Sequence, residues 1–347
     1  MKSRSFEDAI FIVWGPPGHG PRSQVFAREI GIEQPYFIQS TLKRGWWVAP
    51  FKYLTQSIKT IQVLLDKKPS LVFVQSPPSL AAWVIFFYSL ITGCEYIIDA
   101  HSTAMLSPIW TSPKWFNRLV ARRALTTIVT NEHFQKKIRL WGANSLVIRD
   151  IPTNFVKGHY SMLNGPFNVT VVNSFGPDEP LTEVLSAAHN LPDIHFYITG
   201  RIRESHQNLV TTSPENVTFT NFLPNEQYYA LLASSQAVLC LTTRDHTMQR
   251  GACEALWLGK PLITSNWPLL REYFYQGTVH IDNTAEDIQA GIHQIRADLK
   301  FYEKEIVDMQ TSRRKEWLTK KAELINLVHH QDNPSMRENV KVSEDRH

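Results

Sequence analysis

The sequence is short of cysteine and lacks the common motifs of metal, phosphate and nucleophile sites. Its 347 residues include three cysteines, Cys94, Cys240 and Cys253, which form no even set and show no metal-ligand spacing. Asp-x-Asp, HExxH, GxSxG and P-loop motifs do not occur. We therefore expect no disulfide framework, no bound metal and no resident cofactor.

Long hydrophobic runs are also missing. The most hydrophobic stretch, residues 80–91, is well short of the roughly 20 residues that a membrane-spanning helix needs. It predicts a buried helix instead. The first 15 residues have a short apolar run preceded by acids, which is not typical of a signal peptide. With so few cysteines, these features predict a cytoplasmic protein.

Acidic residues are scarce in the first half of the chain. Residues 1–165 contain 19 Lys and Arg against 9 Asp and Glu, whereas residues 166–347 contain 17 against 23. A basic half joined to an acidic half indicates that the first half faces something anionic, such as nucleic acid, phosphates or a membrane surface.

Short β-branched or aromatic runs alternate with longer helical patterns. This alternation, with nearly continuous apolar strands, predicts parallel sheets covered on both faces. The pattern restarts after a stretch rich in Gly, Asn and Pro at 153–167. We predict two doubly wound, Rossmann-like domains, 1–160 and 161–330, with a central cleft between them. Residues 285–329 are almost wholly helical in pattern, and the polar tail 331–347 is predicted to be disordered.

Two short motifs in the first half could carry chemistry. Gly18, His19 and Gly20 belong to a glycine loop between a predicted strand and helix, which is either a ligand or phosphate loop or a plain turn. His101 ends the predicted strand 96–101, where a histidine can meet a substrate, or can simply precede the next helix. Glu132 follows the next strand in the same way, and it is either a second candidate for the site or simply an acid that stabilises a helix N-terminus.

The most specific segment is 242–265. A buried strand ends in a polar loop, and a helix then starts at the small residues Gly251 and Ala252, with Glu254 within its first turns. Small residues let phosphates approach a helix N-terminus. A carboxylate beyond them can accept hydrogen bonds from a ribose, as in dinucleotide folds.

Glu254-Ala255 with Gly259-x-Pro261-Leu-Ile-x-Ser265 resembles the C-terminal signature of glycosyltransferases of the GT-B fold, notably family 4 and its relatives. Four further segments resemble the chitobiosyldiphosphodolichol β-mannosyltransferases in order. These segments are 74–78, 99–101, 148–152 and 173–179. The resemblance implies the GT-B fold over about 1–330, with C-terminal helices that cross back onto the first domain, where Trp317 and Leu318 would pack.

The resemblance also implies roles for individual residues. Glu254 matches the acid that holds the ribose, and Gly251 and Ala252 match backbone donors to the diphosphate. His101 matches the catalytic histidine near the transferred sugar, and Arg201 falls near the usual basic diphosphate contact. This interpretation depends on a Glu254 side chain that is not sealed inside the core.

The sequence departs from the family pattern at two places. His246, beside Asp245 and Thr247, stands where many members carry a second acid, so His246 and Thr247 are candidate sugar-nucleotide contacts. The usual Arg and Lys after the first strand of the second domain are missing from 173–179. Arg250 or Arg244 could replace that positive charge.

We therefore predict a metal-independent hexosyltransferase that moves a sugar from a nucleoside-diphosphate donor to a glycan or polyprenyl-linked acceptor. Basic residues mixed with tryptophan in the first half predict peripheral contact with the inner face of a membrane, whereas no nucleic-acid-binding module is present. A nucleotide-sugar epimerase of the same fold, with Asp99, Glu132, Asp245 and His246 as acid–base groups, and a catalytically degenerate binding or scaffold protein remain alternatives.

Overall fold

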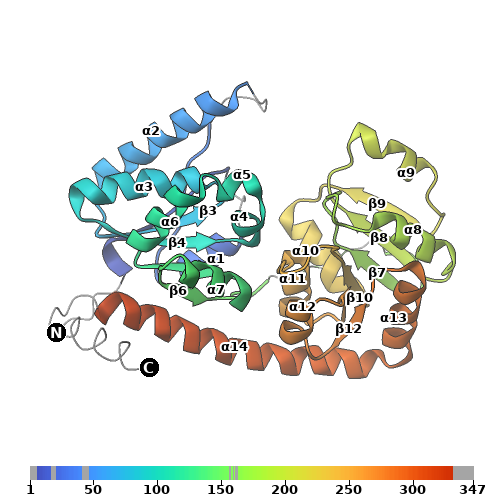
Figure 1. Cartoon of the computed structure of the whole chain (residues 1–347). Helices are drawn as coiled ribbons and strands as arrows, with labels where there is room; N and C mark the ends of the chain where they lie inside the picture. Colours follow the sequence, from blue (N-terminus) through green and yellow to red (C-terminus); the bar gives the residue numbers. More distant parts are fainter. Residues whose placement is uncertain are drawn as a thin grey trace. The chain divides into compact units, whose positions relative to one another are not determined.

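The chain forms two compact units, each built on its own sheet (Figure 1). The computed structural model describes residues 6–16, 21–40, 47–155, 158, 160 and 163–330. The first unit contains residues up to Ile151 together with the chain from Trp317 onward, and the second contains Pro152–Glu316. The first unit therefore ends nine residues before the predicted boundary. The end of the last helix also belongs to this unit.

The sheet of the first unit is wholly parallel, with the strand order β2-β1-β3-β4-β5-β6. Its central strands are buried on both faces, as their continuous apolar sequences predict. The strands are β1 (Ala9–Val13), β2 (Tyr36–Phe37), β3 (Leu71–Ser76), β4 (Glu95–Ala100), β5 (Thr126–Val129) and β6 (Ser145–Val147).

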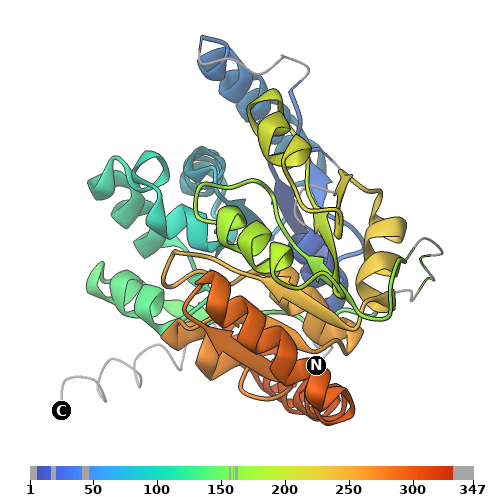
Figure 2. The same cartoon turned by 90° about the vertical axis from the view of Figure 1, so that its right-hand side faces the viewer.

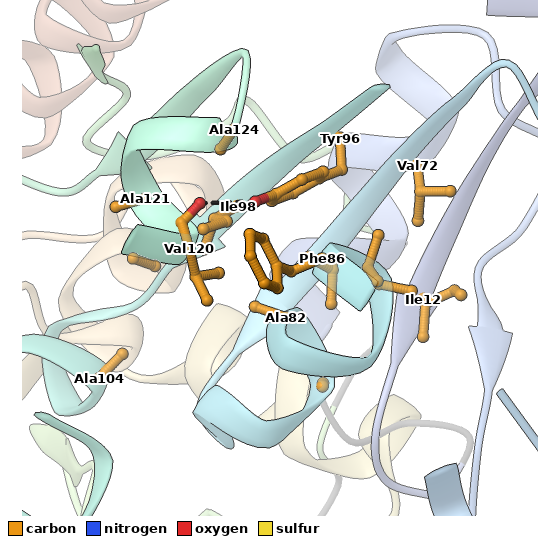
Figure 3. Packing of buried hydrophobic residues seen from close by; sticks show 14 of the residues in the cluster. Ile12, Val72, Ala82, Phe86, Tyr96, Ile98, Ala104, Val120, Ala121 and Ala124 are labelled. Carbon is orange, nitrogen blue, oxygen red and sulfur yellow. Dashed lines mark hydrogen bonds between the residues drawn. The ribbon is translucent and has the colours of Figure 1, made fainter. Parts of the chain in front are cut away.

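Helices cover both faces of this sheet. One core cluster joins alternate strand residues to α2, α3, α6 and α7, and a second joins the other strand residues to α1 and to the end of α14. Figure 3 shows the first cluster, where Phe86 of α3 packs among aliphatic side chains and the Tyr96 hydroxyl donates to the Val120 carbonyl (2.6 Å). The helices are α1 (Pro21–Glu29), α2 (Ala49–Lys67), α3 (Ser79–Thr92), α4 (Ser102–Leu106), α5 (Pro108–Thr111), α6 (Lys114–Arg123) and α7 (Glu132–Leu140), with the short turn η1 (Phe6–Asp8) before β1.

The second sheet is also wholly parallel, with the strand order β12-β11-β10-β7-β8-β9. Numbered within the unit this is the order 6-5-4-1-2-3, so the chain reverses direction across the sheet between β7 and β10. In open sheets of this kind ligands bind at the carboxyl ends of the strands beside such a reversal. The strands are β7 (Asn168–Val171), β8 (His195–Thr199), β9 (Val217–Asn221), β10 (Ala237–Cys240), β11 (Leu262–Ser265) and β12 (Thr278–Ile281).

The helices of the second unit form a layer on each face of its sheet (Figure 2). One core cluster contains residues of α8 and α13, and another contains residues of α10, α11, α12 and the start of α14. Both units therefore confirm the predicted doubly wound α/β fold. The helices are α8 (Leu181–His189), α9 (Gln207–Thr211), α10 (Asn225–Ser234), α11 (Arg250–Leu258), α12 (Pro268–Tyr273), α13 (Ala285–Ala297) and α14 (Leu299–His330), with the turn η2 (Glu204–His206) before α9.

Helix α14 contributes to the cores of both units. Ile306 near its start packs in the second unit, against the backbone at Gly277, whereas Trp317 and Leu324 pack in the first. Trp317 is 4% exposed, as predicted, but Leu318 is 63% exposed, so the prediction that Leu318 packs is wrong. Adjacent helical residues point about 100° apart, and one of the two must face away from the core.

The apolar segment 80–91 is helical as predicted, but only one of its faces is buried. Phe87, Leu90 and Ile91 of α3 are exposed, with Ile91 at 86%. No helix among the described residues is both long and apolar enough to span a bilayer. The predicted tail 331–347 lies outside the described residues.

Candidate functional site

The reversal of strand order brings two loops together at the carboxyl edge of the second sheet. The loop after β7 and the loop after β10 are joined through Asp178, whose carboxylate accepts from the Thr242 hydroxyl (2.9 Å) and whose carbonyl accepts from the Thr243 N–H (2.7 Å). Arg244 adds an ion pair with the same carboxylate (3.3 Å). The polar segment 242–249 is thereby tied to the loop 173–179 that follows β7.

Helix α11 begins at this edge, over the residues that the sequence predicted. A Cβ atom on Gly251 would lie 2.4 Å from Cγ1 of Val172 and 3.0 Å from Sγ of Cys240. The close approach of the helix start to the ends of β7 and β10 therefore requires a glycine. Packing alone explains Gly251, while the backbone N–H groups of Gly251 and Ala252 remain predicted diphosphate donors.

Glu254 lies in the second turn of α11 and is 5% exposed. Its Oε2 accepts a hydrogen bond from the Tyr228 hydroxyl of α10 (2.7 Å), and its Oε1 accepts one from Nε of Arg250 (3.1 Å). Burial, together with the neighbouring carboxylate, raises the pKa of Tyr228 well above its ordinary value. Glu254 is therefore buried, which runs against the condition on which its ribose role depends, a side chain not sealed inside the core.

Glu254 and Arg250 form one ion pair near the start of α11, with 3.1 Å between Oε1 and Nε. The side chain of Arg250 is more open than that of Glu254. A hydroxyl-bearing ligand would therefore meet Arg250 first, with Glu254 behind it.

The residues that depart from the family pattern form a tight turn before α11. His246 has a positive φ of 58°, and its N–H donates to Oδ1 of Asp245 (2.6 Å). The Thr247 hydroxyl donates to the Asp245 carbonyl (3.4 Å). Asp245 thus shapes the turn, and half-buried His246 lies beside it, with Nε2 3.5 Å from Oδ2.

The loop after β7 contains a residue to which the sequence assigned no role. The carboxylate of Glu179 accepts from the N–H groups of Ser174 (2.9 Å) and Gly176 (2.6 Å) and from the Ser174 hydroxyl. Backbone N–H groups that converge in a turn form an anion-binding concavity, and here the chain's own Glu179 carboxylate occupies it.

A cleft of about 530 Å³ opens beside this loop within the second unit. Its lining includes Glu179, Glu183, His206 and Thr243, and its volume falls in the range of ordinary small-molecule sites. Arg201 is exposed just beyond β8, with its guanidinium 5.5 Å from the centre of the Phe222 ring. No sequence motif indicates the cleft, because its lining comes from three separate segments.

The first unit holds a buried ion pair at the carboxyl end of β4. Nη1 of Arg22, from α1, lies 2.6 and 2.7 Å from the two carboxylate oxygens of Asp99, and Nη2 donates to the Ile148 carbonyl (3.1 Å). Burial alone would raise the pKa of Asp99, but its interactions with Arg22 and His101 lower it to about 2. Sequence reasoning missed Arg22, which no motif singled out.

His101 follows β4 directly, and its Nε2 lies 3.2 Å from Oδ2 of Asp99. Nη1 of Arg22 lies 3.4 Å from the same Nε2, so the ring sits between a carboxylate and a guanidinium. A proton on Nε2 would donate to Asp99 and leave the lone pair on Nδ1. The side chain is 26% exposed, so the ring is held on one side and reachable on another.

Two further sites predicted from the sequence are Glu132 and the glycine loop at 18–20. Glu132 begins α7 after the N-cap Asn131 and pairs with Arg149 (2.7 Å), which fits its interpretation as a helix N-terminal acid. Gly18, His19 and Gly20 lie outside the described residues, so their predicted ligand loop stays a prediction.

Known proteins resemble this chain in one segment of sequence and in fold. Residues 181–305 match a family model described as glycosyl transferase-like. That segment contains helix α11, the turn before it and Arg201. No curated protein matches the sequence.

Solved structures share the fold over most of the chain. Sucrose-phosphate synthase from Thermosynechococcus elongatus is 15% identical, with a TM-score of 0.66 over 86% of this chain and 82% of its own. HepE of Anabaena, in complex with UDP and glucose, is 14% identical, with a TM-score of 0.65 over 93% and 99%. A putative UDP-N-acetylglucosamine 2-epimerase from Listeria monocytogenes is 10% identical, with a TM-score of 0.58 over 86% and 90%. The chain therefore has the GT-B fold, as predicted.

Proposed function

We propose that this protein is a GT-B glycosyltransferase that moves a sugar from a nucleoside-diphosphate donor to a hydroxyl of a glycan or polyprenyl-linked acceptor. The observation that carries the proposal is the start of α11 at the strand reversal of the second sheet, inside the segment that matches the glycosyl transferase-like model. HepE, of the same fold, has been solved with UDP-glucose. We place the reaction in the cytoplasm, at the inner face of a membrane.

In this proposal the second unit binds the donor. The positive end of the α11 dipole and the side chains of Arg250 and Arg244 offset the charge that builds up on the leaving diphosphate. Glu254 and Arg250 together accept and donate hydrogen bonds to the ribose hydroxyls. These groups supply positive charge without a metal ion, which is why we propose a metal-independent reaction.

The acceptor is proposed to bind the first unit beside His101. With Nε2–H held by Asp99, Nδ1 can accept a hydrogen bond, or a proton, from the attacking hydroxyl. Arg22 and Asp99 do not need to touch the substrate in this scheme. They hold the imidazole in one tautomer and one orientation.

Calorimetric titration with UDP and GDP tests the donor site through Glu254→Gln. The amide loses the negative charge and is a poorer acceptor, so the variant should bind the nucleotide roughly ten times more weakly, the cost of about one charge-assisted hydrogen bond. The matched control is Glu286→Gln, an exposed acid in the first turn of α13. Equal affinities of the three proteins would contradict the ribose assignment.

His101→Ala tests the acceptor side separately. It should lower turnover with donor and acceptor by roughly a hundredfold, the usual contribution of one general base, while nucleotide affinity stays unchanged. A loss of nucleotide affinity that equals the loss of turnover would contradict the proposed division between the two units.

An epimerase is the second candidate, because a putative epimerase shares the fold. Its acid–base residues would have to come from groups that the structure places in other interactions: Asp99 pairs with Arg22, Glu132 with Arg149, and Asp245 shapes its own turn. Incubation of nucleotide sugars without an acceptor decides the matter, since an altered sugar on an intact nucleotide would favour the epimerase. Failure to bind any nucleoside diphosphate would favour a binding or scaffold protein.

A further inference from the structure

The solvent face of α2 carries an apolar stripe. Phe51, Leu54, Ile58 and Leu65 are all more than half exposed, and their spacing of three, four and seven residues places them on one side of the helix. A surface helix of a globular protein normally turns such a stripe toward the core. In α2 the stripe points away from it.

The inner face of α2 combines buried Leu64 with polar side chains that are hydrogen-bonded to neighbouring segments, and these contacts fix the orientation of the helix. Buried Gln56 donates to the Ile38 carbonyl (2.8 Å), and buried Thr60 accepts from the indole N–H of Trp14 (2.9 Å). Turning the apolar stripe inward would break both bonds and bury other polar groups without partners. The exposed stripe is therefore built into the fold.

The neighbouring helices continue the apolar surface. α3 lies between α2 and α6 on the same face of the sheet. It exposes Phe87, Leu90 and Ile91, and α6 exposes Trp115, at 70%, and Leu119. The ring of Phe87 stacks on that of Phe116 across the two helices, with 5.8 Å between ring centres.

The surface also reaches the edge of the sheet where His101 lies. Trp110 of α5 contacts Tyr53 of α2 edge to face, with 6.3 Å between ring centres, and exposed Ile109 stands beside it. Trp47, immediately before α2, is 72% exposed. We call this set the apolar face: Trp47, Phe51, Leu54, Ile58, Leu65, Phe87, Leu90, Ile91, Ile109, Trp115 and Leu119.

Positive charge accompanies the apolar face. Segments 47–68, 79–92 and 102–123, which contain it, carry eight Lys and Arg and a single acid, Asp66. Exposed apolar and aromatic side chains on segments that also carry an excess of cations match the interface of an anionic bilayer, where tryptophan sits at headgroup depth. A second copy of the chain fits less well, because a symmetric contact would set these cations against one another.

We propose that the apolar face docks the first unit onto an anionic lipid bilayer. The aromatic and aliphatic side chains enter the headgroup region, and the basic residues contact lipid phosphates and carboxylates. Docking would hold the His101 edge of the sheet close to the lipid surface. The proposal does not depend on the sugar-transfer chemistry, since binding to vesicles needs neither donor nor acceptor.

Cosedimentation of the whole protein with phosphatidylcholine vesicles, with and without phosphatidylserine, tests the proposal. The wild-type protein should bind the anionic vesicles more tightly, and added salt should weaken that binding, since salt screens exposed charges. The double variant Leu54→Glu with Ile58→Glu should lose tenfold or more of the partition coefficient, because it removes about two buried aliphatic side chains and adds repulsion. Trp115→Glu should lose a similar share.

Leu318→Glu and Phe301→Glu are matched controls, because both residues are exposed and apolar but lie on α14. They should bind vesicles as the wild type does. All of the substituted positions are on the surface, so melting temperatures and nucleotide titrations of the variants should stay at wild-type values. A change in either would mark a folding defect, and Lys114→Glu with Arg118→Glu would then serve as the second test.

Fluorescence provides an independent readout. Brominated lipid should quench the tryptophan emission of the wild type, and Trp115→Phe should reduce the quenched fraction. Three results would overturn the proposal: no binding of the wild type to anionic vesicles, equal binding of the α2 variant, or a dimer in sedimentation that the α2 variant dissolves while vesicle binding is absent.

Discussion

At the scale of single residues, Asp99 and Glu254 show how differently two buried carboxylates are stabilised. Asp99 has a guanidinium on both oxygens and an imidazole on one of them. Glu254 shares its charge with a more open arginine and a phenol. Asp99 thus pairs with an arginine that is itself largely buried, whereas the arginine that pairs with Glu254 is 26% exposed.

Asp99 should make the protein sensitive to acid. Its folded pKa of about 2 lies below the ordinary 3.8, so the ion pair contributes stability above pH 3.8 that is lost as the pH falls toward 2. The shift corresponds to roughly 2 kcal/mol. Urea unfolding as a function of pH should show this loss in the wild type, and Asp99→Asn should flatten that part of the profile.

The same variant should be much less stable at neutral pH. Asp99→Asn leaves Arg22 buried without a countercharge, which costs about 3–5 kcal/mol. Glu132→Gln breaks the more exposed pair with Arg149 and should change stability by less than about 1 kcal/mol. Equal effects of the two substitutions would contradict the structural role of the Arg22–Asp99 pair.

At the scale of elements, sequence periodicity predicted the alternation of strands and helices but not always which face of a helix is buried. Helix α11 begins at Arg250, beside the predicted Gly251 and Ala252, and it ends at Leu258 because Gly259 takes a left-handed conformation. Periodicity would mislead for helix α2, since the apolar stripe of this helix faces outward and Gln56 faces inward. Local spacing cannot show that the ends of β1 and β2 offer polar partners to α2.

The residues of the candidate site also differ in whether the sequence could predict them. Glu254 and His101 could be found because each follows a strand at a recognisable distance, and both lie at carboxyl edges of sheets. Arg22 and Glu179 could not, because their partners, Asp99 and the Ser174 and Gly176 N–H groups, are set by loop geometry and by contacts distant in sequence.

Gly251→Ala should destabilise the second unit. Alanine normally stabilises a helix by about 1 kcal/mol relative to glycine, so helix propensity alone would predict a more stable protein. Here the added Cβ would lie 2.4 Å from Cγ1 of Val172, a stiff β-branched side chain at the end of β7. We expect a loss of about 1–3 kcal/mol in thermal or urea unfolding.

Val172→Ala in the Gly251→Ala background is the control for this clash. It removes Cγ1, but Cβ of residue 172 would remain 2.8 Å from the new methyl group, so the rescue should be partial. A double-variant cycle with a coupling energy near zero would show that the glycine serves the backbone and not the contact with Val172.

At the scale of the whole molecule, one helix serves two cores. With 32 residues, helix α14 is longer than most helices of globular domains. It passes from the second unit to the first between Glu316 and Trp317. Its sequence predicted a helix and a return to the first domain. The choice of Trp317 over Leu318 as the packing residue depends on helical phase, which contacts distant in sequence determine, among them those with Phe26 and Glu29.

Trp317→Ala should therefore weaken the first unit while the second stays intact. The substitution removes a buried ring that packs edge to face on Phe26, with 5.9 Å between ring centres, and an indole N–H that donates to Glu29 (3.3 Å). Large-to-small changes of buried tryptophan cost about 3–5 kcal/mol. Hydrogen exchange should show faster exchange at amides of α1 and the first sheet, with those of β10 and α11 protected as before. Leu318→Ala, one residue along the same helix and exposed, should change stability by less than about 0.5 kcal/mol. If both units lost protection together, the first unit would not be an independent cooperative block, and the division of α14 between two cores would need to be abandoned.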